Sequence, residues 1–191
     1  MSRIMRDIDQ RARRTRNNIA RAIIELGRHQ PLETITIGKL AEEAGISRST
    51  FYAHFTCLED YLVQSYAWML ERGAQISAAA PGGEDKPLAV RAILDHMARR
   101  REYVLATKAS KFRPVMMTAG EERLQLVAAT NLQRLHAHLS NTERLQLAAF
   151  IAGGFMAMLR SWIGRAMRDT PEEVQLYFEQ FCDALLSGHP R

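Results

Sequence analysis

Apolar residues recur along most of the chain at the three-to-four-residue spacing of amphipathic helices, and no segment shows the strict alternation of a half-buried strand. Between residues 8 and 28, for example, Ile19, Ile23 and Leu26 share one side of a predicted helix, and arginines dominate the opposite side. Further helices are expected at about residues 58–80, 88–101, 103–112 and 121–139, and the third of these should end before Pro114. The pattern predicts an all-α protein with about nine helices.

Two more helices have clear start signals near the C-terminus. Ser140 and Glu143 have the spacing of a capping box, and Thr170 with Pro171 combines a cap and a helix-starting proline. The clearest loop lies between residues 77 and 87, which are rich in Ala, Gly and Pro. We therefore expect three parts: residues 1–58, a bridging helix at 59–80, and residues 81–191.

Residues 36–55 have the pattern of two short helices joined by a sharp turn. Gly45 lies where the chain must turn, and Ser47 can cap the second helix. Phe51 and Phe55, four residues apart, would anchor that helix on its inner side. The polar residues left near its outer surface are Arg48, Ser49, Thr50, Tyr52 and His54. This arrangement favours a helix-turn-helix whose recognition helix carries hydrogen-bond donors.

A denser set of matches lies in the same segment. Ala-Gly-Ile-Ser at 44–47, Thr-Phe-Tyr at 50–52, His-Phe at 54–55 and Glu-Asp at 59–60 stand in register. Residues 34–62 therefore resemble the DNA-binding domain of TetR-family transcriptional regulators. The basic first helix resembles it more weakly, and the remainder is similar only in architecture and length.

The resemblance implies roles for individual residues. Arg48 and Ser49 would face base edges, because an arginine can donate two hydrogen bonds to guanine. Phosphate contacts, which position the helix without specifying sequence, are implied for Thr36, Ser47, Thr50, Tyr52 and His54. The first-helix arginines that could reach the neighbouring minor groove or the backbone are Arg11, Arg13, Arg14 and Arg16.

Two positions depart from the family's pattern. Many members have a phosphate-contacting lysine where this chain has Leu58, and many have an acidic residue at the position of Lys39. Lys39 could replace the missing phosphate contact, or it could be a solvated charge; the two interpretations are equally open.

Charge supports a polyanionic partner for the N-terminal end. The chain has 26 Lys and Arg against 21 Asp and Glu, for a net charge of +5. Residues 1–30 contain eight arginines and three acidic residues, so the whole excess lies in this segment. A solvated basic tail is the alternative interpretation of the charge alone.

Other features argue against a membrane, secreted or enzymatic protein. Cys57 and Cys182 are too few for a disulfide framework or a zinc site, and the uncharged stretch at 145–159 is shorter than a membrane span. His136 and His138 point to different helix faces, and no metal, nucleophile or phosphate-loop motif is recognisable. We expect a cytoplasmic protein that is not an enzyme and needs no cofactor.

The resemblance also implies that the C-terminal helices dimerise and bind an inducer. Small residues on one long helix and apolar residues on the last helix suggest an intersubunit contact, although ordinary packing within one chain is the alternative. The dimer candidates are Ala149, Ala152, Gly153, Met156, Tyr177, Phe178, Phe181 and Leu185. The residues that could line an apolar or aromatic ligand pocket are Trp68, Met97, Tyr103, Phe112, Met116, Met117, Phe155, Met158 and Trp162. We expect His96 to be exposed.

Together these observations predict a TetR-like regulator with a DNA-binding domain at 1–58 and a ligand-sensing, dimerising domain at 81–191. The expected function is a homodimeric repressor that binds a palindromic double-stranded DNA operator and is released by a small apolar or aromatic molecule. The alternatives are a DNA-binding regulator without a ligand response, an activator, or a helical protein-interaction module with a degenerate DNA-binding head.

Overall fold

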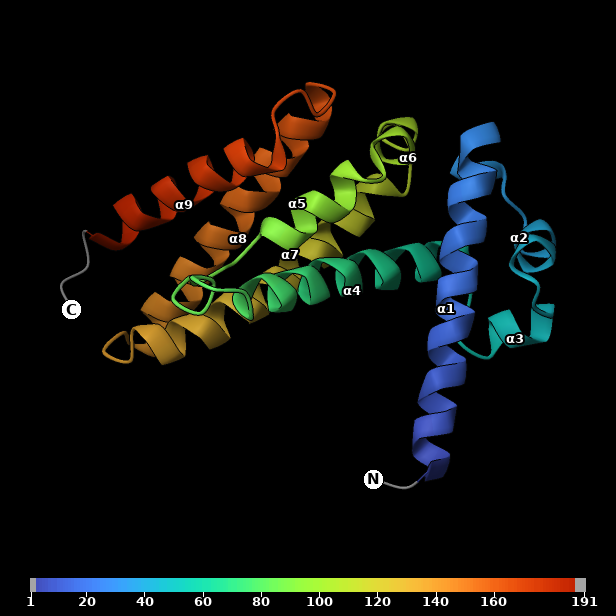
Figure 1. Cartoon of the computed structure of the whole chain (residues 1–191), viewed down its shortest axis with the longest axis horizontal. Helices are drawn as coiled ribbons and strands as arrows, with labels where there is room; N and C mark the ends of the chain where they lie inside the picture. The colour runs from blue at the N-terminus through green and yellow to red at the C-terminus, as the bar shows by residue number, and fades with distance from the viewer. Residues whose placement is uncertain (1–2, 188–191) are drawn as a thin grey trace.

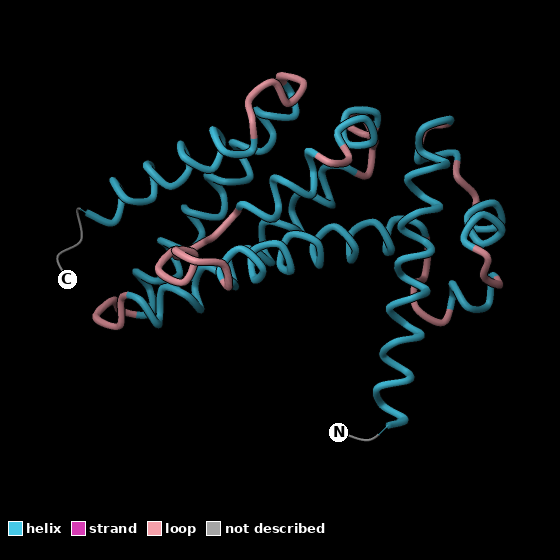
Figure 2. The backbone as a smooth tube through the Cα atoms, viewed as in Figure 1, coloured by secondary structure: helices cyan, strands magenta, loops and turns pink. Residues whose placement is uncertain are grey.

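The computed structural model describes residues 3–187, with side chains from Arg14 onward except that of Ala106. These residues form nine α-helices and one 3₁₀ helix and contain no strand, which confirms the predicted all-α class (Figures 1 and 2). The elements are α1 (Arg3–His29), η1 (Leu32–Thr34), α2 (Ile37–Ala44), α3 (Arg48–Tyr52), α4 (Leu58–Ala78), α5 (Arg91–Ala98), α6 (Arg101–Ala106), α7 (Arg113–Leu135), α8 (Asn141–Gly164) and α9 (Pro171–Ser187).

The helices form a small head and a larger body. In the head, residues 3–62, α1 stands across one end of the molecule with α2 and α3 beside it (Figure 1). In the body, residues 63–187, α4 and α7 form the most extensive helix pair, and α8 packs on α7. α5 packs against α4 and α9, so that the body consists of stacked layers of helices (Figure 2).

Head and body have separate hydrophobic cores, and α4 contributes to both. Its first turns place Tyr61 and Leu62 in the head core, where both are almost fully buried. Two turns later, Leu70 and Ala74 belong to the body core. Because one continuous helix is packed at both ends, a rotation of the head would have to move α4 within the body.

α4 and α7 approach each other closely at a glycine of α7. A Cβ atom on Gly120 would lie 2.5 Å from Cδ1 of Leu70 and 2.8 Å from Cε1 of Tyr66. These distances are shorter than a carbon–carbon contact allows, so the absence of a side chain at position 120 permits this spacing of the two helices.

α8 is the central helix of the body. Phe155 and Trp162 are completely or almost completely buried, and Nε1 of Trp162 donates a hydrogen bond to the carbonyl oxygen of Asp169 at 2.8 Å. Among the described helices, α8 alone is long and apolar enough to cross a membrane, but half of its most apolar window is buried within this chain. Its apolar character is that of a core helix.

The helix boundaries around residue 114 differ from the prediction. We expected Pro114 to end a helix and the following helix to begin near residue 121, whereas Pro114 lies in the first turn of α7, which begins at Arg113. A proline is tolerated there because the first amides of a helix have no partner within the helix. The preceding helices α5 and α6 are correspondingly shorter than expected.

The predicted helix starts near the C-terminus are confirmed. Oγ of Ser140 accepts a hydrogen bond from the amide of Glu143 at 3.3 Å, and the Glu143 carboxylate accepts one from the amide of Ser140 at 2.9 Å. Thr170 and Glu173 make the same reciprocal pair before α9.

We expect Ser140→Ala to lower the free energy of unfolding by about 1 kcal/mol, because it leaves an amide of the first turn of α8 without its side-chain acceptor. Urea denaturation followed by circular dichroism measures the change. Thr142→Ala, on the exposed first turn of the same helix, is the control and should change stability by less than about 0.5 kcal/mol. Equal effects of both substitutions would show that the capping box does not stabilise α8.

Candidate DNA-binding surface and ligand cavity

Two caps and one left-handed residue shape the α2–α3 segment. Oγ1 of Thr36 accepts a hydrogen bond from the amide of Lys39 at 3.3 Å and begins α2. Gly45 ends that helix with φ +64°, a conformation that costs glycine little. Oγ of Ser47 then accepts a hydrogen bond from the amide of Thr50 at 3.0 Å and begins α3. The helix-turn-helix predicted from these residues is therefore present.

An aromatic cluster fixes α3 to the head although this helix has only five residues. Phe51 is completely buried, with its ring centroid 5.6 Å from that of Phe55 and 6.4 Å from that of Tyr61. Asp60 accepts hydrogen bonds from the amide of Thr56 at 2.8 Å and from Nε2 of Gln64 at 2.6 Å. The hydrogen bond donated by the backbone amide of Thr56 is the largest cause that lowers the pKa of Asp60. The link from α3 to α4 is thus held by both packing and a charged acceptor.

The opposite side of α3 is exposed and rich in hydrogen-bond donors. Tyr52 is 56% exposed, which is unusual for a large aromatic residue in a helix of a packed head. Arg48, Ser49 and His54 are also exposed. Oγ of Ser47 lies 2.8 Å from the hydroxyl oxygens of both Ser49 and Thr50, so three hydroxyl groups gather at the start of the helix.

Arg48 lies against Gly38 of the preceding helix. A Cβ atom at position 38 would lie 2.5 Å from Nη2 and 3.2 Å from Cζ of Arg48. The absence of a side chain on α2 therefore allows the guanidinium to lie across that helix. The sequence pattern does not indicate this role of Gly38, because a glycine in the first turn of a helix carries no signal of its own.

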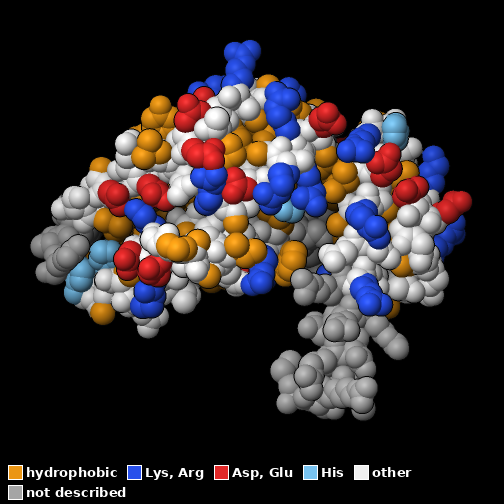
Figure 3. Space-filling view, viewed as in Figure 1, with side chains coloured by type: hydrophobic (Ala, Val, Ile, Leu, Met, Phe, Trp, Pro, Cys, Tyr) orange, Lys and Arg blue, Asp and Glu red, His pale blue; other side chains and the backbone are white. Residues whose placement is uncertain are grey.

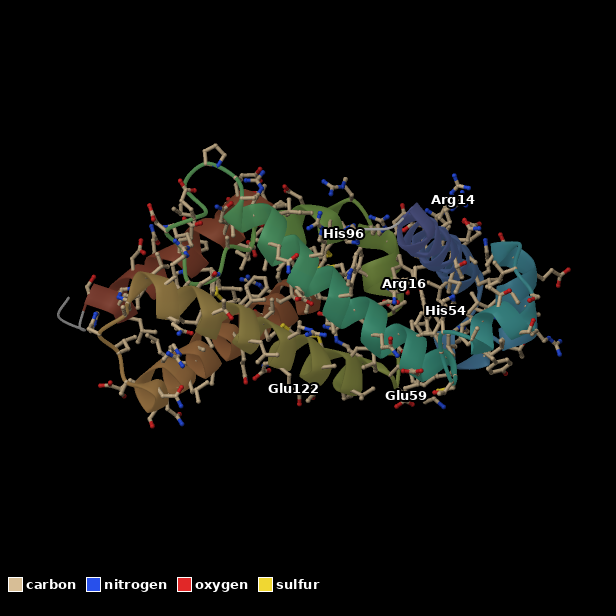
Figure 4. All side chains as sticks on the ribbon, turned by 90° about the horizontal axis from the view of Figure 1, so that it is seen from below. Arg14, Arg16, His54, Glu59, His96 and Glu122 are labelled. Atoms are coloured by element: carbon tan, nitrogen blue, oxygen red, sulfur yellow. The ribbon has the colours of Figure 1, made fainter. Side chains whose placement is uncertain are left out.

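Basic side chains of α1 lie beside this surface. Arg14 and Arg16 are exposed on α1, and Figure 4 shows Arg16 on the same side of α1 as His54 of the α3–α4 link and Arg14 on the other side. Lys39 is exposed too, and its Nζ donates a hydrogen bond to Oε1 of Gln30 at 3.5 Å. The space-filling view shows several basic side chains, with a few acidic ones, on the described part of the head (Figure 3). The side chains of Arg11 and Arg13 lie outside the described residues.

Leu58 and Lys39, the two departures from the family's pattern, have different environments. Leu58 is 8% exposed and belongs to the head core, so the leucine packs where a lysine would have to reach outward. Lys39 remains at the surface beside the start of α2, where a cation is available to a phosphate.

A cavity of about 110 Å³ lies at the junction of head and body. Its walls come from η1, α4, α5, α6, α7 and α8, and they are predominantly apolar. Of the predicted pocket residues, Met97, Tyr103, Met116 and Met117 line this cavity.

The other predicted pocket residues lie elsewhere. Trp68 is 55% exposed, because it is two residues from the lining residue Tyr66 and so points to nearly the opposite side of α4. Phe155 and Trp162 are in the body core, against which Met158 also packs. Phe112 packs against the head core.

His96 is half-buried in the cavity wall, so our expectation that it is exposed was wrong. Burial, assisted by the nearby charges of Arg100 and Arg99, lowers the pKa of His96 to about 4. Nη1 of Arg100 lies 3.5 Å from Nδ1 of the imidazole. His96 is therefore neutral at physiological pH and offers one donor and one acceptor.

The cavity wall also carries a polar contact between head and body. Oε1 of Glu33 in η1 accepts hydrogen bonds from Oγ of Ser110 at 2.7 Å and from the amide of Lys111 at 2.6 Å. The bond from Ser110 is the largest cause that lowers the pKa of Glu33. Ser110 and Leu32, the neighbour of Glu33, both line the cavity. Occupancy of the cavity and the head–body contact therefore involve the same residues.

The comparison with protein families decides the affiliation. A TetR family model described as "Transcriptional regulator C-terminal region" matches residues 87–183, which is just over half of the chain. The chain belongs to the TetR family of transcriptional regulators. The match covers the C-terminal half, where the resemblance found in the sequence was limited to architecture and length. The helix-turn-helix motif lies outside the matched residues.

Several solved structures have the same fold, and the second and third of the following three are named as TetR-family regulators. The dihydroxyacetone kinase operon activator DhaS has a TM-score of 0.63 and 16% identity, with 91% of this chain and 96% of that chain covered. A TetR regulator from Rhodococcus sp. RHA1 has a TM-score of 0.59 and 16% identity, over 94% and 100%. Thermus thermophilus FadR in complex with lauroyl-CoA has a TM-score of 0.58 and 19% identity, over 92% and 96%. No curated protein matches the sequence.

Large apolar side chains are exposed on the last two helices of this TetR-family chain. Phe150 of α8 is 67% exposed, and Tyr177 and Phe181 of α9 are 53% and 63% exposed. Figure 3 shows apolar side chains among acidic ones where α9 lies at the edge of the body. The exposed sides of α8 and α9 that carry these three residues are a candidate contact surface, which we call the α8–α9 face.

The predicted dimer residues divide into two groups. Tyr177 and Phe181 lie on the α8–α9 face, and Ala149 and Gly153 are half-buried on α8. In contrast, Ala152, Met156 and Phe178 are buried in the body core, and Leu185 packs against it. For these four residues the alternative of packing within one chain applies. The sequence pattern missed Phe150, because an apolar residue on an apolar helix does not reveal which side it faces.

We expect Glu33→Ala to lower the free energy of unfolding at pH 7 by about 0.5–1 kcal/mol, since the contact is still partly exposed to solvent. The pKa of Glu33 in the folded protein is below its ordinary value of 4.5. The contribution should therefore be complete above pH 4.5 and disappear as the pH falls through the lowered pKa. Urea denaturation at pH 7, 5, 4 and 3 measures it.

The matched control is Glu42→Ala, which removes an exposed glutamate of α2. It should change stability by less than about 0.5 kcal/mol over the same pH range. A wild-type advantage over Glu33→Ala that persists unchanged at pH 3 would contradict the role of the ionised carboxylate.

Proposed function

We propose that this TetR-family regulator is a homodimeric repressor that binds an inverted-repeat operator and is released by a small molecule bound in the junction cavity. The observation that carries the proposal is the exposed, donor-rich side of α3, held by buried aromatic residues and flanked by arginines of α1. A rigid element that presents donors beside a basic surface suits the major groove of DNA.

Base recognition rests on the start of α3 in this proposal. Arg48 is the first residue of the helix, and the N-terminal residues of a recognition helix are the ones that meet base edges. Ser49 would add a second donor at the same end. The phosphate contacts would come from the surrounding polar and basic residues Arg11, Arg14, Arg16, Thr36, Lys39, Ser47, Thr50, Tyr52 and His54.

In this proposal the head and the body have different functions. Residues 1–58 would bind DNA, residues 59–80 would transmit changes through α4, and residues 81–191 would dimerise and bind the ligand. A ligand that binds the DNA-incompetent arrangement more tightly than the competent one would release the operator. The acyl-CoA in the Thermus FadR structure belongs to that protein, but it supports a small-molecule site in a body of this fold.

The α8–α9 face would form the dimer contact. Three large aromatic residues are exposed on the adjacent helices α8 and α9. A two-fold contact through them would bury all three in both subunits. Two heads related by that axis would read two half-sites of a palindrome. Such a protein would act in the cytoplasm, on double-stranded DNA, without a cofactor or catalytic step.

Selection of bound DNA from a random pool, at two salt concentrations, tests the operator. We expect an enriched inverted repeat with wild-type protein. Arg48→Ala should relax the preference at one base position of each half-site, a loss of about 1–3 kcal/mol. The pair Arg14→Ala and Arg16→Ala should weaken all sequences and flatten the salt dependence instead. Absence of enrichment, or identical profiles for both variants, would overturn the assignment.

Phe181→Glu should shift the protein toward monomer, because it places a charge in the proposed apolar contact. Sedimentation velocity at several concentrations measures the dimer dissociation constant, and we expect it to rise at least tenfold. Leu126→Glu on α7 alters a residue that is 60% exposed and should leave the dimer intact. A dimer unchanged by Phe181→Glu would place the subunit contact elsewhere.

A further inference from the structure

The junction cavity carries positive charge that the chain itself does not neutralise. Arg113, half-buried at the start of α7, and Arg100, exposed in the α5–α6 link, both line it. Among the described residues neither is paired with a carboxylate. Elsewhere in the body, Arg91, Arg123 and Arg165 are paired with acidic side chains. The two cavity arginines are therefore available to an external anion.

The remaining polar groups of the wall are neutral. Burial, as the main cause, raises the pKa of both Tyr66 and Tyr103, so their hydroxyl groups stay protonated. His96 is neutral because burial lowers its pKa to about 4. The Tyr66 hydroxyl donates to Sδ of Met117 at 3.1 Å, whereas the Tyr103 hydroxyl and the His96 imidazole can donate hydrogen bonds to an anion without adding a competing negative charge.

No Asp or Glu is among the described residues that line the cavity. The carboxylate in contact with a lining residue is that of Glu33, and it is already held by Ser110 and Lys111. The cavity therefore has net positive charge and does not suit a cationic ligand.

The rest of the cavity wall favours a ligand with a small apolar part. Leu32, Met97, Val104, Met117 and Ile163 supply apolar surface from five different elements. The volume of about 110 Å³ is smaller than the roughly 150 Å³ of an engineered cavity that binds benzene, so only a small apolar group fits inside. Methionine side chains can adapt to a ring or to a short chain.

We propose that the ligand of the junction cavity is a compact organic monoanion, an apolar ring or short chain that carries one carboxylate, held by Arg113 and Arg100. The proposal rests on the ligand-responsive function proposed above and gives the ligand its chemical class. A guanidinium suits a carboxylate because it can donate two parallel hydrogen bonds to it. The ligand's apolar part lies among the methionines, and its contact with Leu32 of η1 joins it directly to the head.

Calorimetric titration of the full-length protein without DNA tests the ligand class. The probes are benzoate and hexanoate, each paired with its neutral amide, benzamide and hexanamide, which match the acids in size. We expect at least one acid to bind with a dissociation constant at least tenfold lower than that of its amide. Equal affinity of acid and amide, or no binding of either acid up to 10 mM, would overturn the proposal.

Variants of the wall locate the site. Arg113→Gln should weaken binding of the acid at least tenfold and leave the amide unaffected, whereas Arg113→Lys should retain part of the preference for the acid. The matched control is Arg99→Gln, which removes an exposed arginine of the α5–α6 link that does not line the cavity. Thermal denaturation without ligand checks that each variant is folded. An acid affinity unchanged in Arg113→Gln, or lowered equally by Arg99→Gln, would contradict the assignment.

Operator binding is measured separately, so the two proposals can fail independently. If the acid binds through Arg113 but does not displace DNA from the selected operator, the ligand class stands and release by ligand is wrong. If the protein has no operator and the acid still binds, the proposed DNA-binding function fails alone.

Discussion

The simultaneous packing of α4 into two hydrophobic cores is the constraint on which the other features depend. Tyr61 and Leu62 fix its first turns among the aromatic residues behind α3, and Leu70 and Ala74 fix its later turns beneath α5 and α7. A helix is stiff over this distance, so the position of the donor-rich side of α3 is tied to the packing of the body. Without that double burial, the head would be a small helical unit on a flexible connection.

The cavity lies at the same junction, and Tyr66 and Met69 of α4 belong to its wall. Its walls come from both sides of the junction, and the same region carries the hydrogen bonds between Glu33 and the α6–α7 turn. A molecule that fills the cavity therefore meets residues that set the angle between head and body. The energy that such a ligand can contribute to a change of angle is limited to its difference in affinity for the two arrangements. The unpaired arginines offer a source of that difference, because a charge interaction depends strongly on geometry.

Local sequence signals predicted the local structure well. The caps at Ser47 and Ser140 and the turn at Gly45 are formed within a few residues, so their chemistry can be recognised without knowledge of distant contacts. Pro114 misled the prediction, because a proline is compatible with both the end and the start of a helix, and neighbouring packing decides which occurs.

The cavity residues were predicted less well for the same reason. An apolar residue on a helix does not reveal which neighbour it faces, so Trp68 and Trp162 were chosen by type, although one is exposed and the other fills the core. The sequence also gave no reason to separate Arg100 and Arg113 from the other arginines, since pairing depends on which carboxylates the fold brings near.

The amino-acid sequence by itself determined the all-helical class, the helix-turn-helix and its polar outer side, and the concentration of positive charge in residues 1–30. These follow from the spacing of side chains along one or two adjacent helices. Only the tertiary structure decided that Arg48 lies across Gly38, that Glu33 joins head and body, and that two arginines face a cavity without a carboxylate. Those features arise between separate elements of the fold, and the packing of these elements sets the distances.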